Sequence, residues 1–170
     1  MSDPVRILLA EDDDDDFMLT TQALRDNRLV NRVYRVKDGV ELLEYLNRRG
    51  EFENPELSPA PSLILLDLNM PRMDGREALR EIKSNAGLRR LPVVVLTTSR
   101  AQEDIVRAYD LGVNSFISKP VSFHGLVDAV KVLGRYWFEV VDLPEPGSPL
   151  RAGATRDGAE EERNGIRRTA

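Results

Sequence analysis

Five short apolar runs, each followed by a stretch with helical spacing, constrain the fold of this chain more than any other feature. The runs are Val5–Ala10, Arg32–Val36, Leu63–Asp67, Pro92–Thr97 and Ser115–Ser118. The helical patterns are at about Asp15–Asn27, Gly39–Arg49, Gly75–Asn85, Gln102–Leu111 and Phe123–Val141. The first, third and fourth runs are almost wholly apolar, which is typical of strands buried on both faces. The alternation predicts an α/β fold with a five-stranded parallel sheet and helices on both sides.

Length and composition set the domain boundaries. The chain has 170 residues, of which 41% are hydrophobic, enough for one domain with a real core. From Pro144 onward the composition shifts to Pro, Gly, Arg, Glu and Ala without apolar periodicity. We therefore expect a domain over residues 1–143 and a disordered tail over 144–170. Gly50–Pro61 is expected to be a long surface loop.

Charge and residue usage exclude several classes of function. The net charge of −5 argues against nucleic acid or an anionic membrane as the main partner. The chain has no cysteine, which rules out disulfides and zinc thiolates and fits a reducing cytoplasm. It shows neither a signal peptide nor an apolar segment long enough to span a bilayer, so we expect a soluble, cytoplasmic protein. Arg72, Arg76 and Arg80 are expected to form a solvated helix face.

Five polar residues fall where predicted strands end, and the first two begin the acidic run EDDDDD at residues 11–16. In an open α/β sheet, the carboxyl ends of parallel strands form the edge that binds ligands. These residues, which we expect to lie close together, are Glu11, Asp12, Asp67, Thr97 and Lys119.

The carboxylates at this edge suit a hard divalent cation such as Mg²⁺, which takes oxygen ligands and keeps several waters. Asp12 and Asp67 would supply carboxylates, Asn69 a backbone carbonyl, and Glu11 a contact through water. The metal would offset the repulsion within the acidic cluster.

The same edge suits phosphoryl chemistry. Asp67 is a candidate carboxylate nucleophile that would form an acyl phosphate. Lys119 would pair with the transferred group and Thr97 would donate a hydrogen bond to it.

Other interpretations of the acidic residues can be tested on the sequence. An EF-hand loop starting at Asp12 would place Phe17 at the required Gly and Ala23 at the required Glu, so that calcium site fails. A phosphatase of the Asp-x-Asp type would need a carboxylate where Asn69 stands, which argues against rapid turnover. Asp14, Asp15 and Asp16 are expected to charge the start of the next helix, and for Asp13 the choice stays open. A Mg²⁺-dependent phosphohydrolase and a non-phosphorylated interaction scaffold remain the alternatives.

Four motifs, in order over roughly residues 5–140, resemble those of two-component response-regulator receiver domains: ILLAEDD, LILLDLNMPRMDG, PVVVLTTS and GVNSFISKPV. The resemblance implies a flavodoxin-like doubly wound sheet of order 2-1-3-4-5 with five helices. It also implies a phosphorylation switch rather than an enzyme, with a phosphoryl group arriving from a sensor histidine kinase and the signal leaving through a downstream phosphotransfer or effector protein. Because the tail is short and polar, we expect no attached output domain.

The resemblance implies a role for each matching residue. It makes Asp67 the phosphoacceptor, Glu11 and Asp12 the acidic pair, Thr97 the switch hydroxyl, Lys119 the phosphate-binding lysine and Phe116 the switch aromatic. Pro120 implies a cis Lys119–Pro120 bond. On phosphorylation Thr97 would move toward Asp67, and Phe116 would rotate into the vacated space.

A finer resemblance is to stand-alone regulators of bacterial phytochrome kinases, carried by LTTS, the Gly50–Pro61 loop and YWFEVVDLP at Tyr136–Pro144. It implies a phytochrome as the kinase and a homodimer formed by the last helix and its extension.

The helical pattern supports the same dimer. A helix over Phe123–Val141 would be about 28 Å long, whereas the strands beneath it span only about 17–20 Å. Its overhanging end carries Tyr136, Trp137 and Phe138, an aromatic patch that would stay wet in a monomer. Trp137 follows the core-facing helical spacing, but Tyr136 lies well off it. The alternative is that the helix bends back, or that the tail covers these side chains.

Overall fold

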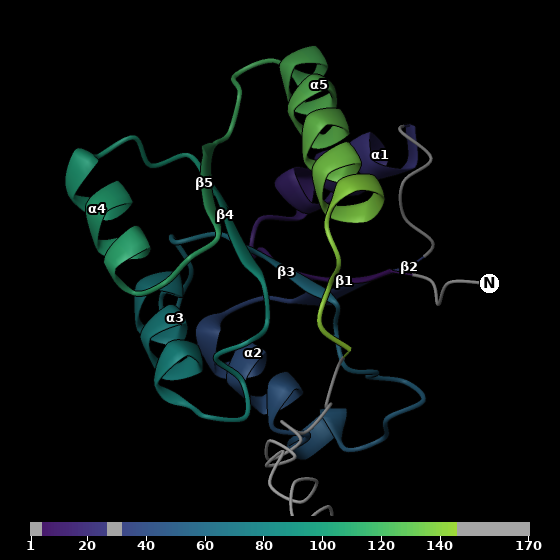
Figure 1. Cartoon of the computed structure of the whole chain (residues 1–170), viewed down its shortest axis with the longest axis vertical. Helices are drawn as coiled ribbons and strands as arrows, with labels where there is room; N and C mark the ends of the chain where they lie inside the picture. Colours follow the sequence, from purple (N-terminus) through teal and green to yellow (C-terminus); the bar gives the residue numbers. More distant parts are fainter. Residues whose placement is uncertain (1–4, 27–31, 146–170) are drawn as a thin grey trace, which may run out of the picture.

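The computed structural model describes residues 5–26 and 32–145, and its centre is one parallel sheet (Figure 1). The strands are β1 (Arg6–Ala10), β2 (Arg32–Val36), β3 (Leu63–Leu66), β4 (Val93–Thr97) and β5 (Ser115–Ser118). They pair in the order β2-β1-β3-β4-β5, all parallel, which confirms the predicted fold class and strand order.

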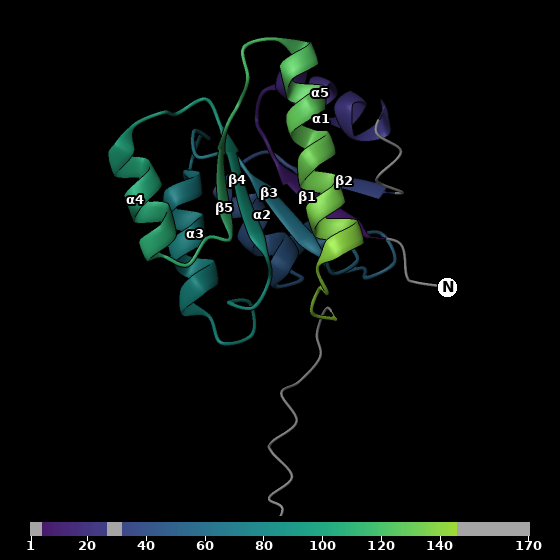
Figure 2. The ribbon, with the colours of Figure 1, turned by 45° about the horizontal axis from the view of Figure 1, so that its top comes forward.

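Helices cover both faces of the sheet (Figures 1 and 2). One face carries α1 (Asp14–Asp26) and α5 (Phe123–Gly134), which pack on each other, and the other carries α2 (Gly39–Leu46), α3 (Gly75–Ser84) and α4 (Gln102–Asp110). Successive strand residues alternate between two cores, as the two-residue period requires. Ile64 and Leu66 face the core on the α2, α3 and α4 side, while Leu63 and Leu65 face the core on the α1 and α5 side.

The acidic run divides between a helix cap and the first turn of α1. Asp13 stands just before the helix, and its Oδ1 accepts a hydrogen bond of 2.8 Å from the backbone N–H of Asp16. That contact makes Asp13 the N-cap, which the sequence had left open. Asp14, Asp15 and Asp16 form the first turn, as predicted.

The long loop after α2 is partly ordered by its own contacts. It contains a short 3₁₀ helix, η1 (Gly50–Phe52). The Tyr45 hydroxyl donates a hydrogen bond of 2.9 Å to the carbonyl of Pro59 and holds the end of the loop against α2.

The last helix differs from the prediction. α5 ends at Gly134 and continues as a π-helical segment, η2 (Arg135–Val140). Trp137 is 8% exposed and belongs to the core on the α1 and α5 side, and Phe138 packs against that core. The expectation that these aromatics remain wet is therefore wrong for Trp137, because the helical segment stays on the domain and buries the indole.

The predicted tail lies almost wholly outside the described residues, which stop at Glu145, so its disorder stays a prediction. Within residues 5–26 and 32–145, no helix is both long and apolar enough to cross a bilayer.

Candidate functional site

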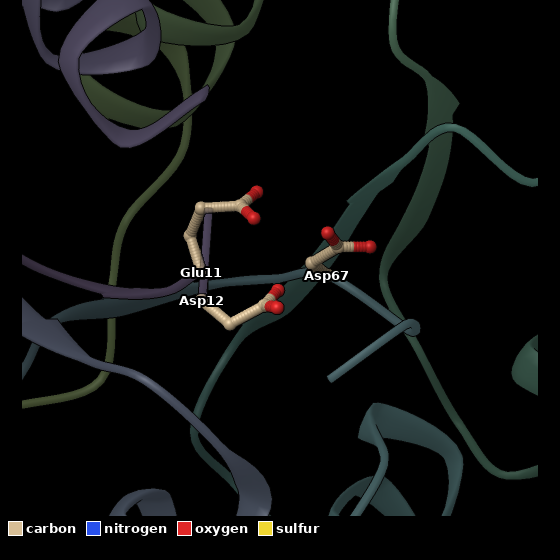
Figure 3. Close-up of side chains that lie close together, drawn as sticks. All are labelled: Glu11, Asp12 and Asp67. Atoms are coloured by element: carbon tan, nitrogen blue, oxygen red, sulfur yellow. The ribbon is translucent and has the colours of Figure 1, made fainter. Parts of the chain in front are cut away.

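Three carboxylates meet at the carboxyl edge of the sheet (Figure 3). Glu11 and Asp12 leave β1, Asp67 leaves β3, and one carboxylate oxygen from each lies within 4.8 Å of the others. Glu11 and Asp67 are buried, whereas Asp12 is exposed, and no hydrogen bond or ion pair of the described residues involves the Asp12 carboxylate. Three convergent oxygen donors, one of them open to solvent, fit a hard divalent cation.

Lys119 is the cation that balances this cluster. Its Nζ contacts Glu11 Oε2, lies 3.0 Å from Asp16 Oδ2 and lies 3.4 Å from Asp67 Oδ2. Burial alone would lower the pKa of Lys119, but the neighbouring carboxylates outweigh it and hold that pKa above its ordinary value. The Asp16 contact was missed from the sequence, which assigned this residue only to the helix start.

Glu11 is the most deeply buried acid of the cluster, at 1% exposure. Burial raises its pKa above the ordinary value, Lys119 opposes that shift, and the nearby Asp67 carboxylate adds to it. A cation at the cluster would favour the ionised form instead.

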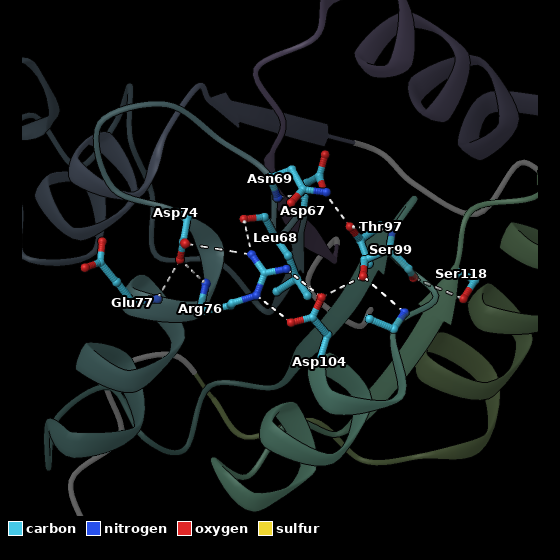
Figure 4. Close-up of polar contacts among 11 residues, drawn as sticks. Asp67, Leu68, Asn69, Asp74, Arg76, Glu77, Thr97, Ser99, Asp104 and Ser118 are labelled. Carbon is cyan, nitrogen blue, oxygen red and sulfur yellow. Dashed lines mark hydrogen bonds and ion pairs between the residues drawn. The ribbon is translucent and has the colours of Figure 1, made fainter.

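Asp67 is held by two donors on its other oxygen (Figure 4). Its Oδ1 accepts hydrogen bonds from Thr97 Oγ1 at 2.8 Å and from the backbone N–H of Asn69 at 3.2 Å. Thr97 is fully buried, and its hydroxyl already donates to Asp67. The predicted movement of Thr97 toward Asp67 would therefore start from a hydroxyl that is already bonded to this carboxylate. The carbonyl role of Asn69 stays a prediction.

The remaining predicted switch residues lie on and after β5. Phe116 is half-buried and packs against the core on the α2, α3 and α4 side. Its backbone N–H donates to the Tyr109 hydroxyl at 3.3 Å. The Lys119–Pro120 peptide bond is trans, so the cis bond expected from Pro120 is wrong in this structure. A trans bond is the ordinary preference before proline, by about 0.5–1 kcal/mol.

A network beside Asp67 was missed from the sequence (Figure 4). Arg76 of α3 forms two parallel bonds to Asp104 of α4, from Nε at 2.7 Å and from Nη2 at 2.6 Å. The Ser99 hydroxyl donates to Asp104 at 2.6 Å. Arg76 is therefore not part of a solvated face, and Arg72 pairs with the buried Asp38 at 2.7 Å, whereas Arg80 is exposed as expected.

The arrangement as a whole suits phosphoryl acceptance by Asp67. A buried carboxylate with an ammonium on one oxygen and a hydroxyl on the other has partners for the charge that a phosphoryl group would bring. The sequence prediction that Asp67, Glu11, Asp12, Thr97 and Lys119 lie together matches where the structure places them.

Known proteins are similar to this chain in sequence and in fold. The model of the response regulator receiver domain family matches residues 7–131. Response regulator Rcp1 of Synechocystis sp. is 42% identical over 141 residues, which cover 83% of this chain and 94% of that protein. The probable methanogenesis regulatory protein FilR2 of Methanothrix harundinacea is also 42% identical, over 85% of this chain and 90% of that protein.

Solved structures of response regulators have a similar fold. The phosphorylated cyanobacterial phytochrome response regulator RcpA superposes with a TM-score of 0.78 at 42% identity, covering 84% of this chain and all of that one. A Mn²⁺-bound form of Rcp1 gives 0.77 at the same identity and coverage.

Proposed function

The chain belongs to the response regulator receiver domain family, and we propose that Asp67 is its phosphoacceptor, taking a phosphoryl group from the phosphohistidine of a sensor kinase. The observation that carries this proposal is the convergence of Thr97, Lys119 and the acidic pair on one buried carboxylate.

In the proposed reaction, one carboxylate oxygen of Asp67 attacks phosphorus. The P–O bond to Asp67 forms while the P–N bond to the kinase histidine breaks, and the leaving imidazole takes up a proton. The Lys119 ammonium, 3.4 Å from Asp67 Oδ2, would pair with the added negative charge. The Thr97 hydroxyl would donate to a phosphoryl oxygen in place of Asp67 Oδ1.

Mg²⁺ is the proposed cofactor. Asp12 and Asp67 would hold it together with the Asn69 carbonyl, Glu11 would contact it through water, and when bound it would neutralise charge on the transferred group. The support is the chemistry of the three carboxylates and their mutual distance.

Phosphorylation is tested with a small phosphoramidate donor and Mg²⁺, followed by intact mass. Wild type should gain one phosphoryl group, and Asp67→Ala should gain none. Unchanged labelling in Asp67→Ala would refute the assignment. Released phosphate is measured alongside, because a proposed acceptor is labelled once and loses the group slowly, whereas a phosphohydrolase would turn over the donor many times.

The proposed donor is a phytochrome histidine kinase, and the proposed recipient is a downstream phosphotransfer or effector protein. RcpA, a cyanobacterial phytochrome response regulator, supports the first choice, while FilR2, a probable methanogenesis regulatory protein, matches this chain at the same identity. Phosphotransfer profiling decides: phosphorylated transmitter domains of phytochrome and other sensor kinases are mixed with this chain, and the fastest transfer identifies the partner class. A second copy of this chain is also a proposed partner, through α5 and η2.

A further inference from the structure

Arg35 of β2 braces the loop that carries the acidic pair. Its Nε donates to the carbonyl of Glu11 at 3.0 Å and its Nη2 to the carbonyl of Asp12 at 3.2 Å. The third nitrogen, Nη1, lies 2.7 Å from Asp14 Oδ1. The guanidinium carbon stands 4.3 Å from the centre of the Phe17 ring, and the side chain is only 18% exposed.

These contacts act where the sheet ends. The parallel ladder pairs β1 with β2 as far as Ala10 and Val36, and the Glu11 N–H still donates to the Val36 carbonyl at 3.0 Å. Beyond that point the Glu11 and Asp12 carbonyls lie outside the β1–β2 ladder, and the Arg35 guanidinium donates hydrogen bonds to them. The fork of Arg suits two adjacent acceptors at once, which a lysine ammonium does not reproduce.

The brace has an electrostatic reason. Glu11, Asp12 and Asp67 carry like charges at short range, and their repulsion favours any loop movement that separates them. Arg35 opposes that movement by fixing the backbone of two of the three residues, and it does so through carbonyls, so the carboxylates themselves stay free for a cation.

We propose that Arg35 is a positioning residue for the divalent-cation site, which it preorganises by holding the backbone of Glu11 and Asp12. The inference rests on the proposed function, since it assumes that this cluster binds the cation. Outer partners that orient metal ligands typically contribute 10- to 100-fold in metal affinity.

The change in cation affinity on removing Arg35 distinguishes a positioning role from a simple charge effect, because the two roles predict opposite signs. If Arg35 were merely a nearby positive charge, its removal would tighten cation binding, because repulsion between two cations would be lost. As a brace, its removal weakens binding.

Lys37 supplies the matched control. Its Nζ lies 3.8 Å from the same Asp14 Oδ1, and among the contacts of the described residues it makes no side-chain bond to the Glu11 or Asp12 carbonyl. Lys37→Met therefore removes a positive charge from beside Asp14, which Arg35 also contacts, without removing the bonds to the Glu11 and Asp12 carbonyls.

The experiment is a calorimetric titration of the full chain with Mg²⁺ at neutral pH, repeated with Mn²⁺ by electron paramagnetic resonance. Arg35→Met should weaken binding about tenfold or more, whereas Lys37→Met should leave it unchanged or slightly tighter. Arg35→Met that binds as tightly as wild type, or more tightly, overturns the inference. Amide spectra check that each variant is folded; if Arg35→Met is not, Arg35→Lys decides by the same criterion. Failure of wild type to bind Mg²⁺ would instead refute the proposed cofactor.

Discussion

Gly75, the first residue of α3, approaches the backbone of Asp67 so closely that no side chain fits between them. A Cβ placed on it would lie 2.2 Å from the Asp67 carbonyl oxygen and 2.8 Å from the Cα of Leu68. The Gly75 N–H also donates to the Leu68 carbonyl at 2.9 Å. The start of α3 is thus packed directly on the proposed phosphoacceptor segment, and the need for glycine is steric.

We predict that Gly75→Ala destabilises the fold by about 1–3 kcal/mol, the usual range for overpacking, and slows labelling of Asp67 because its backbone must shift. Urea unfolding and phosphoramidate labelling measure the two effects. Gly87→Ala is the control, since its new Cβ would meet only the end of the Asn85 side chain, at 3.3 Å. A Gly75→Ala variant within ~0.5 kcal/mol of wild type would contradict the close packing.

Lys119 forms buried ion pairs that should contribute to the stability of the fold. Its side chain is 8% exposed and it is the counter-ion of the buried Glu11 and Asp67. Lys119→Met should cost about 3 kcal/mol in the free energy of unfolding, because breaking a buried ion pair leaves uncompensated charge. Saturating Mg²⁺ should restore more stability to this variant than to wild type, by binding the same carboxylates in the folded state.

Thermal unfolding with and without Mg²⁺ measures that difference, and the double variant with Glu11→Gln is the control. The double variant should be less destabilised than Lys119→Met, since one of the carboxylates left without a counter-ion is gone. The single variant Glu11→Gln completes the double-mutant cycle, and purely additive effects of the two substitutions would mean that Glu11 and Lys119 are not coupled.

At the scale of elements, an ion pair links α3 to α4 above the apolar core that both helices share. Arg76 bonds Asp104 through two nitrogens, and Ser99 donates to the same carboxylate. These two partners, chiefly Arg76, lower the pKa of Asp104 to about 2. The loop between β4 and α4 is thereby fastened beside Thr97.

A pH dependence follows from this pair. Because the folded-state pKa of Asp104 is depressed, its contribution to stability is present above the ordinary carboxyl value and is lost as pH falls toward 2. After allowance for solvent screening, the shift corresponds to about 1–2 kcal/mol at neutral pH. We expect Asp104→Asn to lose about that amount at pH 7 and to approach wild-type stability in acid, by urea unfolding across pH. The exposed Asp110→Asn on the same helix is the control, and a pH-independent deficit would contradict the assignment.

Sequence reasoning found the strands and the chemical residues because both follow short rules. Alternating burial and parallel pairing fix which strand ends meet, and that placed Asp67, Thr97 and Lys119 together. It missed the contacts of Arg35 and Arg76, because an arginine in a sequence is normally assigned to the surface. Only the folded backbone shows that a carbonyl or carboxylate lies within hydrogen-bond distance of its guanidinium. Those contacts join residues 24 and 28 positions apart along the chain, beyond any helical or strand period.

At the scale of the whole molecule, the exposed apolar residues of the last helix bear on the proposed dimer. Val132 and Val140 are 70% and 71% exposed, and Tyr136, midway between them, is 51% exposed. The three follow a four-residue spacing through α5 and η2, which places them on one side. Trp137 packs edge-on against Tyr136, with their ring centroids 5.3 Å apart. We therefore expect the proposed interface to be centred on Tyr136 and to leave out the buried indole of Trp137.

We predict a homodimer at micromolar concentration that Tyr136→Asp dissociates, because a charge at the centre of a two-fold interface meets its own copy. Truncation at Arg135 is a poorer test, since it also removes Trp137 from the core. Tyr109→Asp is the matched control, because Tyr109 on α4 has the same 51% exposure on a different helix. Analytical ultracentrifugation, with and without Mg²⁺ and phosphoryl donor, measures the outcome. A wild-type monomer under every condition refutes the dimer, and a dimer that yields to Tyr109→Asp but not to Tyr136→Asp moves the interface to α4.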